Sequence, residues 1–271
     1  KLTPTFFRCV LKMGVSSESA LTPEGDSMSA TPNPMTDTLR AHTSVRAFTD
    51  EPVSQEDLEA IYESARAASS TCFLQVTTAI RITDKELKAK LAELAGNQKH
   101  IIAAPEFWVF CADYHRDQVL VPKADLGWTE QLIVGCVDAA IQAQNAFAAL
   151  EALGLGGVYA GGIRNHIEEV DRLLKLPQNA FPVVGLAFGH PAHKNELKPR
   201  LPASITLCEN AYQEPDPAEL KAYDEEMRNY YQHRSSNAKD TAWSDELERI
   251  LLRERRPFVL GFLQKKGFAE K

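Results

Sequence analysis

The chain has 271 residues, a length that allows one large domain or two small ones, and 44% of them are hydrophobic while 25% are charged. With 14 glycines and 15 prolines, this composition excludes collagen-like, low-complexity and wholly disordered proteins. The 30 basic and 37 acidic residues give a net charge of −7, the wrong sign for general binding to nucleic acid or anionic lipid. Any anionic ligand must therefore be held by a local group of basic side chains.

Neither membrane insertion nor disulfide bonding is indicated by the sequence. The longest stretch without Asp, Glu, Lys or Arg, residues 176–193, contains three prolines and several polar side chains, so it does not predict a membrane span. The five cysteines are odd in number, far apart and without a C-x-x-C pair. This usage favours reduced thiols in a cytoplasmic protein over a disulfide framework or a zinc site.

Residues 1–34 differ in composition from the rest of the chain. Ser, Thr and Pro dominate their second half, and no helical or alternating pattern is sustained. The apolar start is interrupted by Arg8 and Lys12, so it lacks the apolar core of a secretory signal. We predict a disordered leader or a translated upstream segment, followed by one intimately folded domain over residues 35–271.

In the first half of this domain, the sequence pattern predicts alternating helices and strands. A helical pattern over residues 55–68 follows Ser54, whose hydroxyl can cap it. Asp84 can cap a second helix, which Gly96 ends. Strands are expected over residues 77–83 and 107–112.

A long helix from Glu130 to Leu153 is apolar or Ala on nearly every face. Such a helix is expected to be buried around most of its circumference, in the core or at a subunit interface. Residues 155–163 then predict a short strand or loop. Asn165 is expected to start another helix, with Glu168 in the capping-box position, before a strand over residues 182–189.

The last third begins with a helix capped by Asp216, with Pro217 in its first turn. Its inward residues are expected to be Leu220, Tyr223, Met227 and Tyr230. A polar, basic loop over residues 232–240 separates this helix from another that starts at Asp245. The pattern of elements is mixed α and β.

Two basic clusters are candidates for anion binding. His42–Arg46 reads His-Thr-Ser-Val-Arg, in which arginine offers a planar fork for phosphate and the other side chains add shorter donors. Lys198 and Arg200 flank Pro199, and this proline together with Pro202 stiffens the backbone and holds the two cations close together. Taken alone, a cluster like the first more often arises by chance at a solvated helix end. An ordinary surface loop explains the second cluster equally well.

Other polar and glycine-rich segments have similarly open interpretations. The pairs Gly156-Gly157 and Gly161-Gly162 allow close approach of a flat ligand, but glycine pairs more often serve tight turns. Residues 69–75 and 97–100 supply amides and hydroxyls, which elsewhere cap helices or face solvent. No metal-ligand spacing, phosphate-binding Walker loop or nucleophile elbow occurs, so an organic cofactor is the expected source of any chemistry.

Together these segments resemble, in order and spacing, the bacterial nitroreductase flavoprotein family. The resemblance covers residues 35–271 and leaves only the leader unmatched. Its motifs in this chain are HTSVRAFTDEPVS, SARAASSTCFLQ, IRITDK, GNQKHI, TEQLIVG, LGLGGVYAGGIRN, LKPRLPASI and WSDELER.

The resemblance implies an α+β, nitroreductase-like fold, with an antiparallel-rich mixed sheet flanked by helices. It also implies an interlocked homodimer that holds two FMN molecules at its interface. The phosphate and ribityl chain of FMN are expected at the basic clusters, the isoalloxazine at residues 70–75 and Gln98, and flavin N5 at the backbone of Gly161 or Gly162. Thr43 stands where the family usually has an arginine. The implied FMN-binding residues are His42, Thr43, Ser44, Arg46, Ser70, Phe73, Gln75, Gln98, Tyr159, Gly161, Gly162, Lys198 and Arg200.

For NADPH, the resemblance implies binding by Arg164, Arg234 and Lys239. Arg234 occupies the place of an arginine that grips the 2′-phosphate. Lys239 fills a second basic position and keeps the charge without the bidentate fork, so we expect weaker discrimination against NADH. A solvated connection is the alternative explanation of this loop's composition.

The implied activity is two-electron, ping-pong reduction of nitroaromatics and quinones by NADPH, with no catalytic side chain beyond those that orient FMN. A flavin reductase that supplies reduced FMN to a partner is the alternative enzyme. A non-catalytic flavin-binding protein is the alternative of another class, although a storage protein needs no NADPH-gripping loop. No metal, nucleic acid or membrane is expected as a partner.

Overall fold

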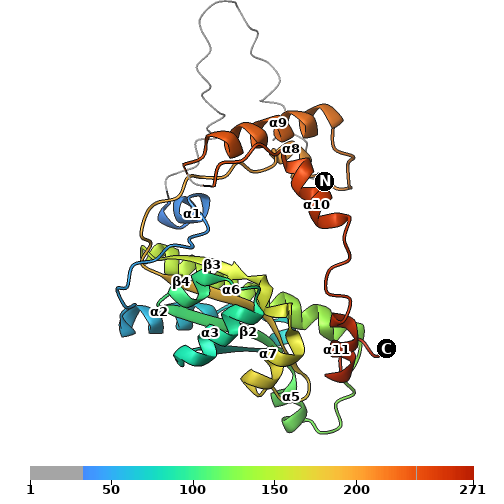
Figure 1. Ribbon diagram of the computed structural model, residues 1–271. Helices are drawn as coiled ribbons and strands as arrows, with labels where there is room; N and C mark the ends of the chain where they lie inside the picture. Colours follow the sequence, from blue (N-terminus) through green and yellow to red (C-terminus); the bar gives the residue numbers. More distant parts are fainter. Residues whose placement is uncertain (1–32, 236) are drawn as a thin grey trace, which may run out of the picture. The chain divides into compact units, whose positions relative to one another are not determined.

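Four strands form one sheet, in which neighbours run antiparallel in the order β1-β2-β4-β3 (Figure 1). The computed structural model describes residues 33–235 and 237–271, so the expected leader lies outside the described residues apart from Asn33 and Pro34. One parallel bridge joins Ser44 to Gly157 on β3. The expected α+β class is confirmed. The strands are Thr77–Arg81 (β1), Glu106–Asp113 (β2), Gly156–Ala160 (β3) and Ala180–Gly189 (β4).

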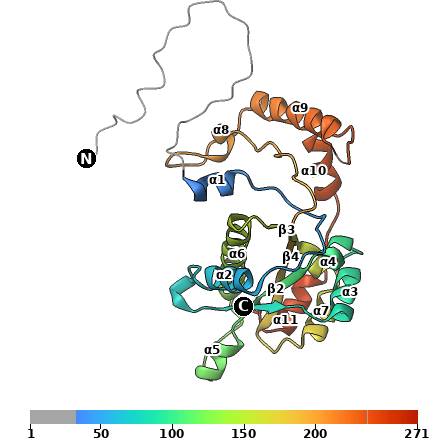
Figure 2. The ribbon, with the colours of Figure 1, turned by 90° about the vertical axis from the view of Figure 1, so that its left-hand side faces the viewer.

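Strand β2 organises the core, because all eight of its residues are buried. Successive side chains of a strand point to opposite faces of the sheet. Phe107 and Val109 accordingly pack with α3, α4 and α7, whereas Trp108 and Phe110 pack with α2 and α6. Figure 2 shows α2 and α6 on one side of the sheet and α3 and α7 on the other. These helices are Gln55–Arg66 (α2), Lys85–Leu94 (α3), Lys99–Ala103 (α4), Thr129–Ala152 (α6) and Ile167–Leu174 (α7).

The long central helix α6 differs from its prediction in how it is buried. Its inner face, including Phe147, packs against β2 and β4, but Ile133, Val137 and Ile141 are 52%, 45% and 38% exposed. These three residues are four positions apart and form one apolar stripe along the helix. The expectation of burial around most of the circumference is therefore wrong for a single chain. By length and composition the helix is apolar enough to cross a membrane, but its inner face packs in the core.

Most of the predicted helix caps are present. Ser54 Oγ accepts from Asp57 N at 3.0 Å, and Asp84 Oδ1 accepts from Leu87 N at 2.9 Å. The cap predicted at Asn165 is wrong: α7 begins after His166, and the Asn165 amide instead donates to a distant backbone carbonyl. The Asn165 side chain therefore forms a tertiary hydrogen bond and not the helix cap that the local sequence predicted.

The C-terminal arm, residues 194–258, leaves the sheet after β4. Asp216 caps α9 as predicted, and Tyr223, Met227 and Tyr231 form its buried face. The predicted inward residues Leu220 and Tyr230 are only half-buried. The arm contains Ala203–Thr206 (α8), Pro217–His233 (α9) and Trp243–Leu251 (α10), and the remaining helices of the chain are Pro34–Arg40 (α1), His115–Leu120 (α5) and Val259–Lys265 (α11), with the 3₁₀ turns Thr71–Phe73 (η1) and Gly161–Arg164 (η2).

Candidate functional site

The predicted anion-binding segment His42–Arg46 is attached to the edge of the sheet. Val45 N donates to Gly157 O on β3 at 2.8 Å. On its other side, the Asn195 side-chain amide donates to Ser44 O at 2.8 Å. Hydrogen bonds to its backbone, from β3 on one side and from a side-chain amide on the other, hold the segment in place.

A buried carboxylate orients His42. Nδ1 of His42 lies 2.8 Å from Glu151 Oε1 of α6. The His42 ring packs edge-on against Phe147, with 4.9 Å between the ring centroids. Burial raises the pKa of Glu151, and the contact with His42 opposes that shift. Because Nδ1 faces Glu151, Nε2 is the nitrogen left for the pocket that His42 lines.

A cationic pocket of about 540 Å³ brings this segment together with the C-terminal arm. It contains eight of the residues predicted for FMN or NADPH, and five of these are lysines or arginines. Because many like charges surround one cavity, the pocket favours a ligand with several negative charges. The eight residues are His42, Thr43, Ser44, Arg46, Lys198, Arg200, Arg234 and Lys239.

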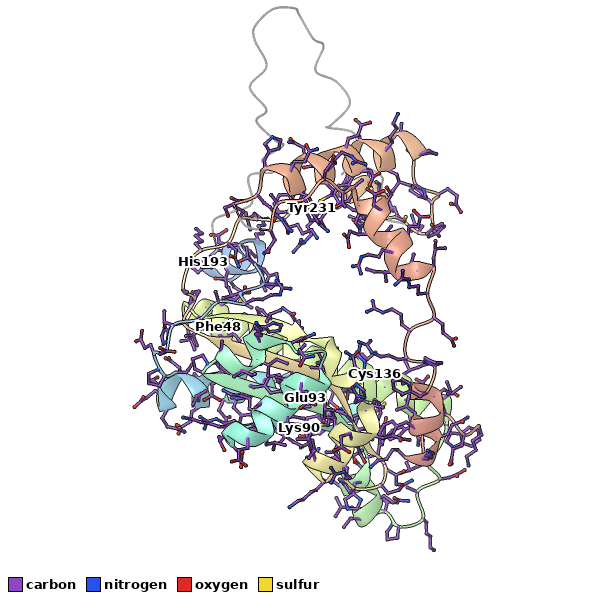
Figure 3. All side chains as sticks on the ribbon, viewed as in Figure 1. Phe48, Lys90, Glu93, Cys136, His193 and Tyr231 are labelled. Atoms are coloured by element: carbon purple, nitrogen blue, oxygen red, sulfur yellow. The ribbon has the colours of Figure 1, made fainter. Side chains whose placement is uncertain are left out.

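Tyr231 of α9 holds three of these cations. Lys198 Nζ, Arg234 Cζ and Lys239 Nζ lie 5.0, 5.0 and 4.4 Å from the centroid of its ring. Figure 3 shows Tyr231 on this helix and His193 on the segment that follows β4; both line the pocket. Aromatic rings attract cations through their negative faces, so a buried tyrosine can keep several together. No motif of the sequence singled out this residue.

Both predicted NADPH-binding side chains of the arm already have partners. Arg234 Nε donates to Asn237 O at 2.9 Å. Lys239 Nζ forms an ion pair with Glu246, which also accepts from Arg249. Hydrogen bonds from these two cations lower the pKa of Glu246 to about 2. A 2′-phosphate must therefore compete with a carboxylate for Lys239.

The predicted isoalloxazine segment forms a loop clamped by Asp138 of α6. Asp138 is buried and accepts from Ser70 Oγ at 2.6 Å and from Thr71 Oγ1 at 2.9 Å. Ser70 Oγ in turn accepts from Gln75 N at 2.7 Å. Phe73 and Gln75 have φ values of 60° and 57°, and Phe73 is 78% exposed. The clamp thus maintains a strained loop that presents an aromatic side chain to the outside.

Gln98 and Gly162, two further predicted FMN-binding residues, lie next to each other. A Cβ atom on Gly162 would lie 2.3 Å from Ala95 O and 2.7 Å from Gln98 Nε2, so only glycine fits. Gln98 Oε1 is buried and has no hydrogen-bond partner among the described residues. An unpartnered buried acceptor indicates that a donor is missing from the site.

Eight of the sixteen predicted residues do not line the cationic pocket, and Tyr159 and Arg164 are two of these. Tyr159 OH donates to Gln144 Oε1 at 3.2 Å. Arg164 donates to Val183 O, and its charge acts on Arg256 at the far end of the arm. The structure therefore does not bring Arg164 together with Arg234 and Lys239, and its predicted role toward NADPH has no geometric support.

Comparison with known protein families identifies the family to which the chain belongs. A family model for the nitroreductase family matches residues 39–190, and one for the nitroreductase family C-terminal domain matches residues 198–271. The chain belongs to the nitroreductase family. The expected membership is thereby confirmed, and the second match begins at Lys198 of the cationic pocket.

Similarity to individual nitroreductases extends over most of the chain. It is 51% identical over 237 residues to the oxygen-insensitive NADPH nitroreductase of Salmonella typhimurium, covering 88% of this chain and 99% of that protein. It is 43% identical to the NADPH-flavin oxidoreductase of Vibrio harveyi, covering 87% and 98%. The crystal structure of nitroreductase A from Vibrio parahaemolyticus matches with a TM-score of 0.84 at 44% identity, covering 89% of this chain and all of that one. The expected nitroreductase-like fold is confirmed.

Proposed function

We propose that this protein is an FMN-dependent NADPH oxidoreductase that reduces nitroaromatic compounds and quinones. The observation that carries the proposal is the cationic pocket, in which the two predicted phosphate-binding groups, near Arg46 and near Arg234, line one cavity. Relatives named as an NADPH nitroreductase, an NADPH-flavin oxidoreductase and an FMN reductase (NADPH) support the same cofactors. In balanced form, a nitro group, NADPH and one proton give a nitroso group, NADP⁺ and water.

The residues present fit FMN. Arg46, Lys198 and Arg200 can neutralise a phosphate in the cationic pocket, and His42 can donate to it through Nε2. The buried, unpartnered Gln98 Oε1 can accept from a ring N–H group of the isoalloxazine. When bound, FMN supplies two-electron hydride chemistry, and the protein supplies orientation and charge.

The remaining roles belong to the chain's own side chains. Glu151 keeps the His42 ring turned toward the pocket, and Asp138 keeps the loop at Ser70 in its strained conformation. Arg46 or Lys198 would place positive charge near a bound flavin and so favour negative charge on it. Arg234 and Lys239 are proposed to bind the 2′-phosphate of NADPH, as the resemblance implies.

We propose that the protein is a homodimer in the cytoplasm. The exposed stripe of Ile133, Val137 and Ile141 on α6 would otherwise leave apolar surface in water. Leu251 and Leu252 at the end of α10 are 73% and 76% exposed and leave further apolar side chains in water. Free cysteines within the described residues are consistent with a reducing compartment.

A flavin reductase is the second candidate function, because the Vibrio harveyi relative is named for that activity. Steady-state rates with free FMN and with a nitrofuran as acceptor separate the two. A higher kcat/KM for the nitrofuran supports the proposal, and a higher value for free FMN supports the alternative.

The visible spectrum of the purified protein tests the shared cofactor. We expect the two absorption bands of oxidised flavin, bleached by NADPH under nitrogen and restored by a nitroaromatic. Bands that do not bleach would indicate the third alternative, a non-catalytic flavin-binding protein. A colourless protein that does not take up added FMN would overturn the proposal.

A further inference from the structure

A second group of arginines lies where the arm returns to the sheet, between α10 and α11. It surrounds a separate cavity of about 270 Å³, which we call the arginine pocket. Four guanidinium groups and one carboxylate line this cavity, so its charge is strongly positive. The lining residues are Asn165, Arg249, Arg253, Glu254, Arg255 and Arg256.

Much of this positive charge has no partner among the residues that the structure describes. Arg249 is paired with Glu246 at 2.8 Å. Arg256 donates through Nε and Nη2 to the neutral amide oxygen of Asn165, at 2.9 and 2.6 Å. Within residues 33–235 and 237–271, Arg253 and Arg255 have no hydrogen bond or ion pair. A cavity lined by unpaired guanidinium groups is suited to an anion rather than to a neutral molecule.

The arginine pocket is connected to the glycine segment through Asn165. Asn165 Nδ2 donates to Ala95 O at 3.2 Å, and that same carbonyl lies against Gly162. Arg256 is thus linked through one side chain and one carbonyl to the segment that the resemblance places at flavin N5. This link relates the arginines to the segment at which an acceptor would react.

We propose that the arginine pocket binds the anionic group of an electron acceptor, so that nitroaromatics carrying a carboxylate are preferred over neutral ones of the same shape. The inference rests on the proposed function. Arg253 and Arg255 are its specificity-determining residues, because their guanidinium groups offer paired N–H donors that match a carboxylate. A neutral acceptor makes no such contact and leaves the arginines solvated.

Calorimetry tests the binding without requiring turnover. The protein is loaded with FMN so that the cationic pocket is filled, and 4-nitrobenzoate is compared with 4-nitrobenzyl alcohol. We expect the carboxylate to bind about tenfold more tightly, and the double variant Arg253→Gln/Arg255→Gln to lose that preference. Arg172→Gln is the matched control, because it removes an exposed arginine paired with Glu169 on α7. Equal affinities of the wild-type protein for both compounds would overturn the inference.

Kinetics with the same pair of acceptors separate this inference from the proposed function. We expect the ratio of kcat/KM for the two compounds to fall about tenfold in the double variant and to stay constant in Arg172→Gln. About 0.5 M salt should weaken the preference of the wild-type enzyme in the same direction. Reduction of both compounds without preference would leave the proposed function standing and reject the inference. If neither compound is reduced, the proposed function fails, and calorimetry still decides on the pocket.

A partner subunit's carboxylate is the competing explanation of the unpaired arginines. In that case the double variant would change the oligomeric state and not the charge preference. Light scattering on the wild-type and variant proteins distinguishes the two. A dimer that dissociates in the double variant while the acceptor preference persists would overturn the inference.

Discussion

Buried apolar side chains hold the sheet and its helices together, whereas the C-terminal arm relies on charged and aromatic contacts. Strand β2 is buried at every position, and clusters on both faces enclose it. In the arm, the buried cluster comprises Tyr223, Met227 and Tyr231 of α9. Cations of the arm instead pack around the ring of Tyr231, and two further contacts are the ion pairs of Lys239 and Arg249 with Glu246. Its conformation should therefore depend on ligands and on a second chain more than that of the sheet does.

The contrast between the two regions can be tested at α6, a core helix that exposes an apolar stripe on its outer face. Ala140 is exposed beside Ile141, so a charge there faces the proposed partner and leaves the core unchanged. We expect Ala140→Glu to convert the dimer into monomers and to release flavin with it. Light scattering and absorption at the flavin bands measure both effects. A dimer with full flavin content in this variant would show that the stripe is not the interface.

Removing an arginine from the sheet side of the cationic pocket is expected to have the next largest effect. Arg46→Ala should weaken FMN binding by about 10- to 150-fold, because one charge-assisted contact is worth roughly 1.5 to 3 kcal/mol. Fluorescence titration of apoprotein with FMN measures the affinity. Arg40→Ala, at the exposed end of α1, is a matched control that should leave it unchanged. Full FMN retention in Arg46→Ala would remove this residue from the site.

The corresponding change in the arm should affect the nicotinamide substrate. Arg234→Ala is expected to raise the KM for NADPH by about 10- to 100-fold and to leave the KM for NADH nearly constant. Reoxidation of pre-reduced enzyme by the acceptor should hardly change. Arg234→Lys, which retains the charge, should restore part of the NADPH affinity. Equal losses with both nicotinamides would mean that the contacts of Arg234 with Tyr231 and Asn237 order the arm.

The smallest expected effect concerns Glu246, which holds Lys239 in the arm. Glu246→Gln should lower the KM for NADPH by about two- to fivefold, because exposed ion pairs are worth little and the lysine is freed for a phosphate. The KM for NADH should not change. Glu248→Gln is the matched control, because it neutralises an exposed carboxylate of α10 that forms no ion pair among the described residues. A higher KM for NADPH in Glu246→Gln would mean that the carboxylate positions Lys239 for binding.

Local patterns predicted the elements of the sheet region better than those of the arm. The caps at Ser54 and Asp84 act over three residues, and the two-sided apolar character of β2 is visible in its own residues. Short helices such as α5 and α11 were missed, because six or seven residues do not establish a period. The cap at Asn165 was assigned wrongly because its side chain bonds to Ala95, 70 positions away.

The candidate site likewise has features that local sequence predicted and features that only the tertiary structure decided. The sequence determined the basic and glycine motifs near His42, Lys198 and Gly161 together with their family, because those residues lie in short contiguous segments. Only the tertiary structure decided what holds them in place. Asp138 clamps a loop 68 positions away, and Glu151 orients His42 from 109 positions away. Tyr231 contacts cations from the segments that precede and follow α9. Side chains so far apart in the chain meet only when the helices pack on the sheet, and no local periodicity encodes that meeting.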